Sequence, residues 1–372
     1  MKVLLVANTD WYLFRFRLAL ARQLRAAGHE VVLVSPAGEF VASLQEEGFR
    51  WVAWNVSRRG MDPWREAAAV NALTRIYEQE RPALVHHHTL KPILYGSIAA
   101  WRADVPHVID SVAGRGYLFL SASLRARLVR PLLSSIFRWA LSERADLVTF
   151  ENEDDLRLFL DRHWVHEGKT RLISGVGVDT DYFVPLPEPE GVPVALLVGR
   201  MLWDKGVETF VEAAKMLEPG GGIRFALAGS PDPGNPSSVP EEALTHWAES
   251  GWVEWWRWQQ DVRKAYAACA MVVLPSRGEG LPVSLVEAAA CARPLVATDV
   301  PGCRDVVDDG VNGYLVPVDD ATALAKAIQK LVEDASVRER MGKASRRLAE
   351  EKFDVRLING HMLNLYEQVL EP

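Results

Sequence analysis

Cysteine is scarce in this chain, and long apolar runs are absent from it. The 372 residues include three cysteines, Cys269, Cys291 and Cys303, which fit neither the even count of a disulfide framework nor the spacing of a zinc site. No apolar run approaches the ~20 residues that cross a bilayer. The apolar N-terminal segment already ends at Asn8, which makes it too short for a secretory signal peptide. The sequence therefore predicts a cytoplasmic protein.

Two further absences restrict the class of function. A dinucleotide-binding oxidoreductase needs G-x-G-x-x-G after its first strand, and VANTDWYLFRF (6–16) contains no glycine. The net charge is −7, divided into +2 for residues 1–185 and −9 for the remainder, and no nucleic-acid recognition motif occurs. We therefore expect no nucleic-acid partner, and we expect the two halves of the chain to face different partners.

The pattern of apolar residues predicts an α/β protein. A chain of 372 residues, 49% of them apolar, is too long for one ordinary core. Apolar runs alternate with helical patterns in both halves, which is typical of doubly wound units with a mostly parallel sheet. The expected strands are KVLLVA, EVVLVSP, LVHHH, HVIDSV and DLVTF in the first half, and VALLVG, RFALAG, MVVLPS, PLVATD and GYLVPV in the second. The expected helices span 14–27, 64–80, 207–217, 283–292 and 321–333.

Prolines mark the boundary between the two halves. They interrupt both helix and strand in DYFVPLPEPEGVPV (181–194), so we predict one domain of residues 1–185 and a second of residues 186–355. Ligands of doubly wound sheets bind beyond the carboxyl ends of the strands. The loops at those ends, and a cleft between the two domains, are therefore where we expect the site.

Residues 115–144 are strongly basic. They hold six arginines and a single acid, Glu143, interleaved with aromatic and aliphatic side chains. This composition suits the surface of an anionic membrane, so we expect peripheral contact with the cytoplasmic face of the inner membrane. The alternative is an ordinary amphipathic helix whose arginines face solvent.

The segment RGEGLPVSLVEAAA (277–290) places a glutamate inside an apolar helix. Pro282 suits a first helical position, and a helix that is apolar on nearly every side is normally buried. Its polar members, Ser284 and Glu287, are three residues apart and share one face. A buried carboxylate needs a hydrogen-bonding partner, from the protein or from a ligand that lies along this face.

A second glutamate, Glu279, precedes that helix. The amides of Gly280 and Leu281 would point out of the helix N-terminus and offer an anion site beside Glu279. An anionic ligand with polar groups on both sides of its charge fits this layout. The alternative is that Glu279 only complements the helix dipole and that Glu287 pairs with an internal arginine.

A basic pair follows the first strand of the second half. Arg200 comes directly after VALLVG, and Lys205 with Gly206 stands just before a helix. Arginine can bind a diphosphate in bidentate fashion and lysine adds a point charge, so the pair suits a diphosphate at a helix N-terminus. A surface arginine and a loop lysine without a ligand are the alternative.

Together these segments resemble the GT4 glycosyltransferases of GT-B fold, over essentially the whole chain. The resemblance rests on GVGVDTDYF (175–183), GRMLWDKGVETFVEAA (199–214), AGSPDPGNPSSVPEEAL (228–244) and LPSRGEGLPVSLVEAAACARPLVATDVPGCRDVVDDGVNGYLVP (274–317), in which Glu279 and Glu287 form the E-x7-E pattern. The start VANTDWYLFRFRLALARQLRAAGHEV and HHHTLKPILYGSIAA (86–100) are similar to the subgroup that builds capsule and related surface glycans on polyprenyl diphosphate carriers.

The resemblance implies a fold and an activity. The fold has two Rossmann-like domains facing a cleft: an acceptor domain (1–185), completed by a returning C-terminal helix within 356–372, and a nucleotide-sugar donor domain (186–355). The activity is retaining, metal-independent transfer from a nucleotide sugar, most often a UDP-hexose or UDP-N-acetylhexosamine. The acceptor is a glycan, linked to a polyprenyl diphosphate in this subgroup. No cofactor is expected.

The resemblance also assigns roles to residues. Glu279 would hold hydroxyls of the donor sugar, while Arg200 and Lys205 would neutralise charge on the leaving diphosphate; these three are the expected catalytic residues. Glu287 would hold the ribose hydroxyls, and the two amides after Glu279 would meet the diphosphate. The expected donor site consists of Gly199, Arg200, Lys205, Glu279, Gly280, Leu281, Ser284 and Glu287.

On the acceptor side the sequence departs from the family pattern. There is no histidine near Val112, where many relatives have one, and the paired-glycine loop after the first strand is replaced by polar residues. The remaining polar candidates for acceptor contact are Asn8, Asp10, His88, Lys91 and Asp110. One of the three consecutive histidines (86–88) is alternatively a hydrogen-bonded core residue.

Two other segments allow more than one interpretation. In EWWRWQQD (254–261), where relatives commonly have a glycine near Arg257, Trp256 or Trp258 either stacks on the base or packs in the core. The triplet 179–181 reads D-x-D, but it falls at the joint between domains, so we expect no metal role.

Two other classes of protein were weighed against the transferase. A nucleotide-sugar 2-epimerase shares the two-domain architecture, but it gives the basic segment 115–144 no purpose. A lectin-like or scaffold protein would tolerate the loss of Arg200 or Lys205, and both are present. The sequence therefore favours the glycosyltransferase.

Overall fold

The computed structural model describes residues 1–57, 62–113, 134–217 and 222–370. They form two compact units, Met1–Val176 with Arg356–Pro372, and Gly177–Val355. The boundary predicted at 185/186 lies beyond this division. Val178 pairs with Asp354, and the buried side chain of Phe183 packs in the core of the second unit, so this stretch of chain already belongs there.

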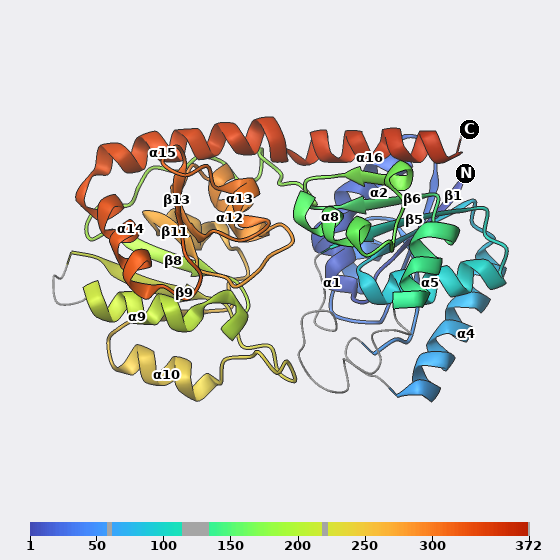
Figure 1. The fold of residues 1–372 in the computed structure, drawn as a ribbon, viewed down its shortest axis with the longest axis horizontal. Helices are drawn as coiled ribbons and strands as arrows, with labels where there is room; N and C mark the ends of the chain where they lie inside the picture. Colours follow the sequence, from blue (N-terminus) through green and yellow to red (C-terminus); the bar gives the residue numbers. More distant parts are fainter. Residues whose placement is uncertain (58–61, 114–133, 218–221, 371–372) are drawn as a thin grey trace. The chain divides into compact units, whose positions relative to one another are not determined.

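The first unit is built on a parallel sheet of seven strands in the order β3-β2-β1-β4-β5-β6-β7 (Figure 1). Its strands are β1 (Lys2–Val6), β2 (Glu30–Ser35), β3 (Arg50–Ala53), β4 (Leu84–His88), β5 (His107–Val112), β6 (Leu147–Phe150) and β7 (Thr170–Leu172). The strand order reverses between β1 and β4, which are paired in parallel. This reversal creates a topological switch point at their carboxyl ends.

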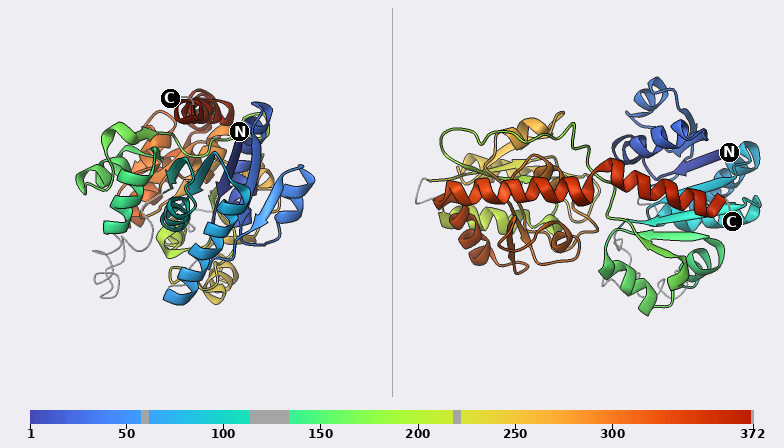
Figure 2. Two further views of the ribbon diagram at one scale, coloured as in Figure 1. Left: turned by 90° about the vertical axis from the view of Figure 1, so that its right-hand side faces the viewer. Right: turned by 90° about the horizontal axis from the view of Figure 1, so that it is seen from above.

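Helices cover both faces of the first sheet. They are α1 (Asp10–Tyr12), η1 (Leu13–Arg17), α2 (Leu18–Ala26), α3 (Val41–Glu46), α4 (Pro63–Glu80), α5 (Leu90–Arg102), η2 (Trp139–Arg144), α8 (Glu153–Asp161), η3 (Glu167–Lys169) and α16 (Val355–Leu370). Alternate residues of β1 point to opposite faces: Leu5 packs with α2 and α16, and Leu4 packs with α4 and α5. Helix α16, red in Figure 2, therefore contributes to the core of the first unit, as the expected returning helix does.

The second unit repeats this plan with six parallel strands in the order β10-β9-β8-β11-β12-β13. They are β8 (Val194–Val198), β9 (Arg224–Ala228), β10 (Glu254–Arg257), β11 (Met271–Leu274), β12 (Leu295–Thr298) and β13 (Gly313–Val316). The switch point of this sheet lies between β8 and β11, which are also paired in parallel.

The helices of the second unit likewise form two layers. They are η4 (Trp203–Lys205), α9 (Val207–Leu217), α10 (Glu241–Glu249), α11 (Arg263–Ala267), α12 (Val283–Ala290), α13 (Cys303–Val306), α14 (Ala321–Glu333), α15 (Ala335–Leu348) and η6 (Ala349–Phe353). Helices α9 and α14 pack on the face that contains Leu197, and α12 packs on the face that contains Leu196 (Figure 1). Both faces of each sheet are therefore buried, which explains why the strands read as continuous apolar runs.

All ten strands expected from the sequence are present, and the helices 207–217 and 321–333 have the predicted bounds. The predicted helix 14–27 begins earlier, as α1 and η1, and ends one residue sooner. Strands β3, β7 and β10 were not predicted, because each is short and has exposed or half-buried residues.

The basic segment 115–144 lies mostly outside the described residues, which resume at 134. Its membrane contact therefore stays a prediction. Within the described ranges, the structure contains no helix with both the length and the apolar character needed to span a bilayer.

A substitution at Gly96 in α5 tests how closely that helix packs against β4. A Cβ at this position would lie 2.2 Å from Nε2 of His87, whose ring is hydrogen-bonded to Tyr77 and Asp110 and cannot turn away. We expect Gly96→Ala to lower the free energy of unfolding by about 1–3 kcal/mol, as overpacking does. The control is Gly360→Ala in α16, where no atom lies within 4 Å of the added Cβ.

The control variant should gain roughly 0.5–1 kcal/mol, because alanine is the better helix former. Urea unfolding of both variants measures the difference. A Gly96→Ala protein as stable as the Gly360→Ala protein would contradict the packing described here.

Candidate active site

Most of the predicted site residues lie at the switch point of the second sheet. The loop after β8 contains Arg200 and Lys205, and the loop after β11 contains Glu279 and leads into α12. Because β8 and β11 are neighbours and parallel, both loops leave the same edge of the sheet. The structure thereby joins two segments that are about 75 residues apart in the sequence.

An ion pair connects the two loops. Nζ of Lys205 donates to Oε1 of Glu279 at 2.6 Å, and both side chains are largely shielded from solvent, with 21% and 10% exposed. The backbones also touch at Gly206, where a Cβ would lie 1.9 Å from the carbonyl oxygen of Pro275. Gly206 has φ +70°, so both the conformation and the contact require glycine.

Arg200 stands at the exposed end of the same loop. Its Nη1 donates to Oδ2 of Asp232 at 2.5 Å, and this carboxylate also accepts from Asn235 at 3.1 Å. Asp232 belongs to the turn-rich loop after β9, which is bound to the Arg200 loop through backbone bonds such as that from Met201 to Ser230. Asp232 was not among the predicted site residues, since an aspartate in a turn rich in Pro, Gly and Ser is ordinary turn chemistry.

The second glutamate, Glu287, is buried in α12 with 6% of its surface exposed. The hydroxyl of Tyr266 in α11 donates to Oε2 of Glu287 at 3.0 Å and lies 3.1 Å from the carbonyl oxygen of Ser284. Burial and the charge of Glu287 raise the pKa of Tyr266 well above its ordinary value, so the phenol stays a neutral donor. Sequence reasoning missed Tyr266, because a tyrosine in a short helix before an apolar strand has no distinguishing pattern.

The start of α12 differs from the prediction by one position. Pro282 is extended, with φ −76° and ψ 96°, and is the N-cap of the helix rather than its first residue. Gly280 and Leu281 therefore precede the cap, and the first amide to bond within the helix is that of Leu285, to the carbonyl oxygen of Pro282. The side chain of Leu281 is buried in the core of the second unit. The backbone at Gly280 is closely approached by Gly302, whose added Cβ would lie 2.2 Å from the Gly280 carbonyl oxygen.

The remaining residues of the predicted donor site lie on the same two loops. Gly199 follows β8 with φ +152°, and an added Cβ there would meet no atom within 4 Å. Ser284 is half-buried in the first turn of α12. Contact of Gly199 and Ser284 with a donor stays a prediction.

The tryptophans after β9 divide into two environments. Trp256 is partly buried against the core of the second unit, and its indole nitrogen donates to Glu254 at 2.9 Å. Trp258 is 63% exposed just beyond the carboxyl end of β10. Between them Arg257 has φ +56° at an irregularity in the β9–β10 pairing, a backbone region that glycine adopts most readily. The core interpretation fits Trp256, whereas Trp258 remains available to a base.

Most of the residues of the first unit that were predicted to contact the acceptor are hydrogen-bonded within the protein. Asp110 is fully buried and hydrogen-bonded to His87 at 2.7 Å, and burial raises the pKa of its carboxyl. Lys91 donates to the carbonyl oxygen of Ser57 at 2.6 Å and to Glu66 at 2.9 Å. Asp10 accepts from the amide of Phe40 at 2.8 Å.

The histidines on β4 also differ from one another. His86 is hydrogen-bonded to Tyr366 and Ser111, both at 2.6 Å, and it is a core residue as much as His87 is. His88 is fully buried, yet neither of its ring nitrogens has a hydrogen-bonding partner among the described residues. Asn8, the last acceptor candidate, is half-buried after β1.

The D-x-D triplet forms hydrogen bonds within the protein that fix the local backbone. Asp179 accepts from the amides of Asp181 and Tyr182, both at 3.0 Å, and the hydroxyl of Thr180 donates to Asp354. Across the described part of the chain, no three His, Cys, Asp or Glu side chains are grouped as metal ligands.

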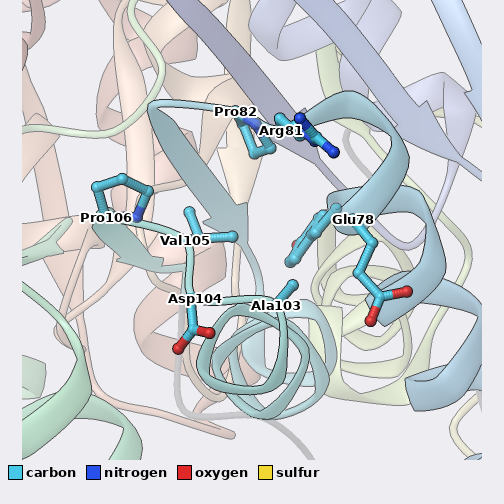
Figure 3. Close-up of a pocket in the computed structure, with 8 residues that line it drawn as sticks. Glu78, Arg81, Pro82, Ala103, Asp104, Val105 and Pro106 are labelled. Atoms are coloured by element: carbon cyan, nitrogen blue, oxygen red, sulfur yellow. The ribbon is translucent and has the colours of Figure 1, made fainter.

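A cavity of about 480 Å³ opens at the other edge of the first sheet, before β4 and β5 (Figure 3). It is lined by Tyr77, Glu78, Arg81, Pro82, Ala103, Asp104, Val105 and Pro106. The charged groups of Glu78, Arg81 and Asp104 extend to separate corners in Figure 3 and do not converge. None of the predicted site residues lines this cavity.

Comparison with known proteins identifies the family. Residues 2–152 match the family described as glycosyl transferase 4-like, and residues 192–334 match glycosyl transferases group 1. The alpha-maltose-1-phosphate synthase of Mycolicibacterium smegmatis is 30% identical over 338 residues, which cover 80% of this chain and 82% of that protein. The chain belongs to the GT4 family of glycosyltransferases.

Two further relatives extend over the full length of this glycosyltransferase. The N,N'-diacetylbacillosaminyl-diphospho-undecaprenol alpha-1,3-N-acetylgalactosaminyltransferase of Campylobacter jejuni is 26% identical over 384 residues, covering 100% of both chains. The crystal structure of Anabaena HepE in complex with UDP and glucose has a TM-score of 0.81 at 20% identity, with 99% of each chain covered. The predicted GT-B fold class is confirmed, and nothing in these comparisons points to the epimerase.

Tyr266 provides a test of how Glu287 is positioned in this glycosyltransferase. We expect Tyr266→Phe, which removes only the hydroxyl, to raise the KM for the nucleotide sugar about tenfold while kcat changes less than twofold. A hydrogen bond to a charged group is worth about 1.5 kcal/mol or somewhat more, and about 1.4 kcal/mol corresponds to a factor of ten.

Initial rates over a range of donor concentrations measure this effect. The matched control is Tyr182→Phe, since Tyr182 lies in the same unit and is 42% exposed. Equal KM values for the two variants would show that the Tyr266 hydroxyl does not position Glu287.

Proposed function

We propose that this glycosyltransferase transfers a sugar, with retention of anomeric configuration, from a UDP-sugar to a glycan on a polyprenyl diphosphate. The observation that supports the proposal most strongly is the meeting of Lys205 and Glu279 at the switch point of the second sheet, 2.6 Å apart. A cation for phosphate and a carboxylate for sugar hydroxyls are thereby placed side by side, as a nucleotide sugar requires.

The donor is assigned to this edge of the second unit. Glu287 accepts hydrogen bonds from the ribose hydroxyls, Glu279 accepts from hydroxyls of the sugar, and Gly280 and Leu281 supply amides to the diphosphate. Tyr266 donates to one oxygen of Glu287 and so helps to fix this carboxylate in place. The exposed Trp258 covers the base.

The reaction separates a nucleoside diphosphate from the anomeric carbon. Negative charge increases on the diphosphate as this bond breaks, and Lys205 and Arg200 stabilise that charge most strongly in the transition state. In the structure Arg200 is paired with Asp232 and Lys205 with Glu279. A diphosphate therefore exchanges partners with two carboxylates, and the ammonium and guanidinium groups take the role that a divalent metal has in other transferases.

The acceptor is inferred from a relative and from the first unit. The Campylobacter jejuni relative bears in its name a sugar linked through a diphosphate to undecaprenol, and it matches this chain from end to end. We propose an acceptor of the same chemical class, bound by the first unit. Contact of residues 115–144 with anionic lipid would hold the enzyme at the cytoplasmic face of the inner membrane, where such acceptors lie.

A transfer assay tests the proposal directly. Native protein, UDP-N-acetylgalactosamine, UDP-N-acetylglucosamine or UDP-glucose, and a short-chain polyprenyl diphosphate sugar are combined with EDTA, and the product is analysed by mass spectrometry and by the anomeric proton coupling constant. We expect one donor to yield an α-linked product at a rate that EDTA does not change. Loss of activity on chelation, or an inverted product, would refute the metal-free retaining mechanism.

Lys205→Met in the same assay connects the activity to the site. Removing one preorganised group that stabilises transition-state charge typically lowers kcat by about 10²–10³. Lys215→Met is the control, because Lys215 is a half-buried lysine on α9 of the same unit that pairs with Glu212 outside the proposed site. If Lys205→Met keeps the kcat of the control, the site has been assigned to the wrong loops.

A further inference from the structure

The first sheet has a switch point of its own, between β1 and β4. The chain that follows β1 forms α1 and η1 and supplies Tyr12 and Arg17, while β4 ends at His88. The rings of Tyr12 and His88 lie 5.7 Å apart between centroids, so these segments meet at one place. The rule that locates ligands at switch points applies here as it does in the second sheet.

Arg17 is a buried cation that forms no ion pair with any side chain in the described part of the chain. Only 4% of its surface is exposed, and its Nη2 donates to the hydroxyl of Tyr12 at 3.0 Å. Within the described residues no carboxylate lies within 4.0 Å of its guanidinium, and Nε has no hydrogen-bonding partner. Burial raises the pKa of Tyr12, so its phenol is neutral and does not balance the charge. Burying an unpaired ion costs several kcal/mol, and a protein tolerates that cost chiefly where the ion has a function.

The surroundings of Arg17 add further hydrogen-bonding groups, and the cavity beside it also contains one carboxylate, that of Glu151. Burial and the positive charge of Arg17 hold the pKa values of His86 and His88 well below their ordinary range, so both imidazoles are neutral. The two ring nitrogens of His88 have no partner in the described part of the chain. A buried, neutral imidazole without a hydrogen-bonding partner, close to a guanidinium, is a second indication that a polar ligand binds here and supplies the missing hydrogen bonds.

A small cavity opens beside Arg17. Its volume is about 10 Å³, and its polar lining consists of Arg17, Ser111, Thr149, Glu151 and the backbone at Gly175. This volume is close to that of one water-sized group, so a single phosphoryl oxygen fits without displacing the chain. The hydroxyls of Ser111 and Thr149 also line the cavity, where they are hydrogen-bonded to each other at 2.7 Å and Ser111 is bonded to His86 at 2.6 Å. The carboxylate of Glu151 suits a sugar hydroxyl.

We propose that Arg17 binds a phosphoryl oxygen of the acceptor's diphosphate, so that the first unit selects acceptors by their phosphate as well as by their sugar. The inference rests on the proposed function and names the group that recognises its acceptor class. The donor's diphosphate is the other possible source of such an oxygen. Arg200 and Lys205 of the second unit are already assigned to the donor's diphosphate.

Kinetics with two acceptors that share one sugar test the proposal. One acceptor is the short-chain polyprenyl diphosphate sugar, and the other is an octyl glycoside of the same sugar, which has no phosphate. For Arg17→Met we expect at least a tenfold higher KM for the diphosphate acceptor, a KM for the UDP-sugar within twofold of native, and an unchanged rate with the octyl glycoside.

Stability provides a second, independent measurement. Because methionine replaces an unneutralised buried charge, ligand-free Arg17→Met should melt at the same temperature as the native protein or higher. Arg22→Met is the control, since Arg22 is an exposed arginine on α2 that pairs with Glu47. Arg17→Lys, which keeps the charge but not the fork geometry, should give an acceptor KM between those of the native and Arg17→Met proteins.

The outcomes separate this inference from the function on which it rests. If the native protein transfers to the diphosphate acceptor while Arg17→Met keeps the native acceptor KM, the assignment of Arg17 is wrong and the function stands. An equal loss on both acceptors, a raised donor KM, or a melting temperature lowered well below that of the control would also overturn it. If the native protein transfers to neither acceptor, the proposed function itself fails and the assignment fails with it.

Discussion

The contact between the loops after β8 and β11 is the constraint on which the proposed donor site depends. Gly206 lies against the carbonyl oxygen of Pro275 so closely that only a glycine fits, and the Lys205–Glu279 ion pair stands beside this contact. The backbone contact fixes the distance between the loops, and the ion pair fixes the directions of the two side chains. A ligand that bears both a diphosphate and hydroxyls meets a cation and a carboxylate already in place, so little ordering is needed on binding.

The two units share the strand order around their switch points, but the basic side chains at the two switch points differ in burial and in ion pairing. In the second unit the exposed Arg200 and the shielded Lys205 are paired with carboxylates, which a diphosphate can replace. In the first unit Arg17 is more deeply buried, and among the described residues its guanidinium donates to the neutral phenol of Tyr12 and forms no ion pair. Paired cations suit a ligand that must leave after each turnover as a nucleoside diphosphate, because the carboxylates take its place.

Much of this architecture could be predicted from the sequence, because strands buried on both faces are apolar throughout and helices such as 207–217 have clear periodicity. The loops of the proposed donor site were predicted from the E-x7-E pattern and from the basic pair before a helix, and the structure brings these two loops together. Residues that act through tertiary contacts could not be found this way. Tyr266 meets Glu287 across a separation of 21 residues. The burial of Arg17 without an ion pair among the described residues likewise depends on tertiary packing, which a single sequence does not show. The domain boundary was misplaced because prolines mark an irregular chain, and an irregular chain can still pack on a core, as Phe183 does.

The central claim is that α12 and the loop before it bind a uridine nucleotide without metal. Calorimetric titration of UDP into the native protein and into Glu287→Ala, each with EDTA, tests it most directly. The account predicts micromolar binding by the native protein that chelation leaves unchanged, and at least tenfold weaker binding by the variant. Absence of UDP binding, or equal affinities of the two proteins, would contradict it.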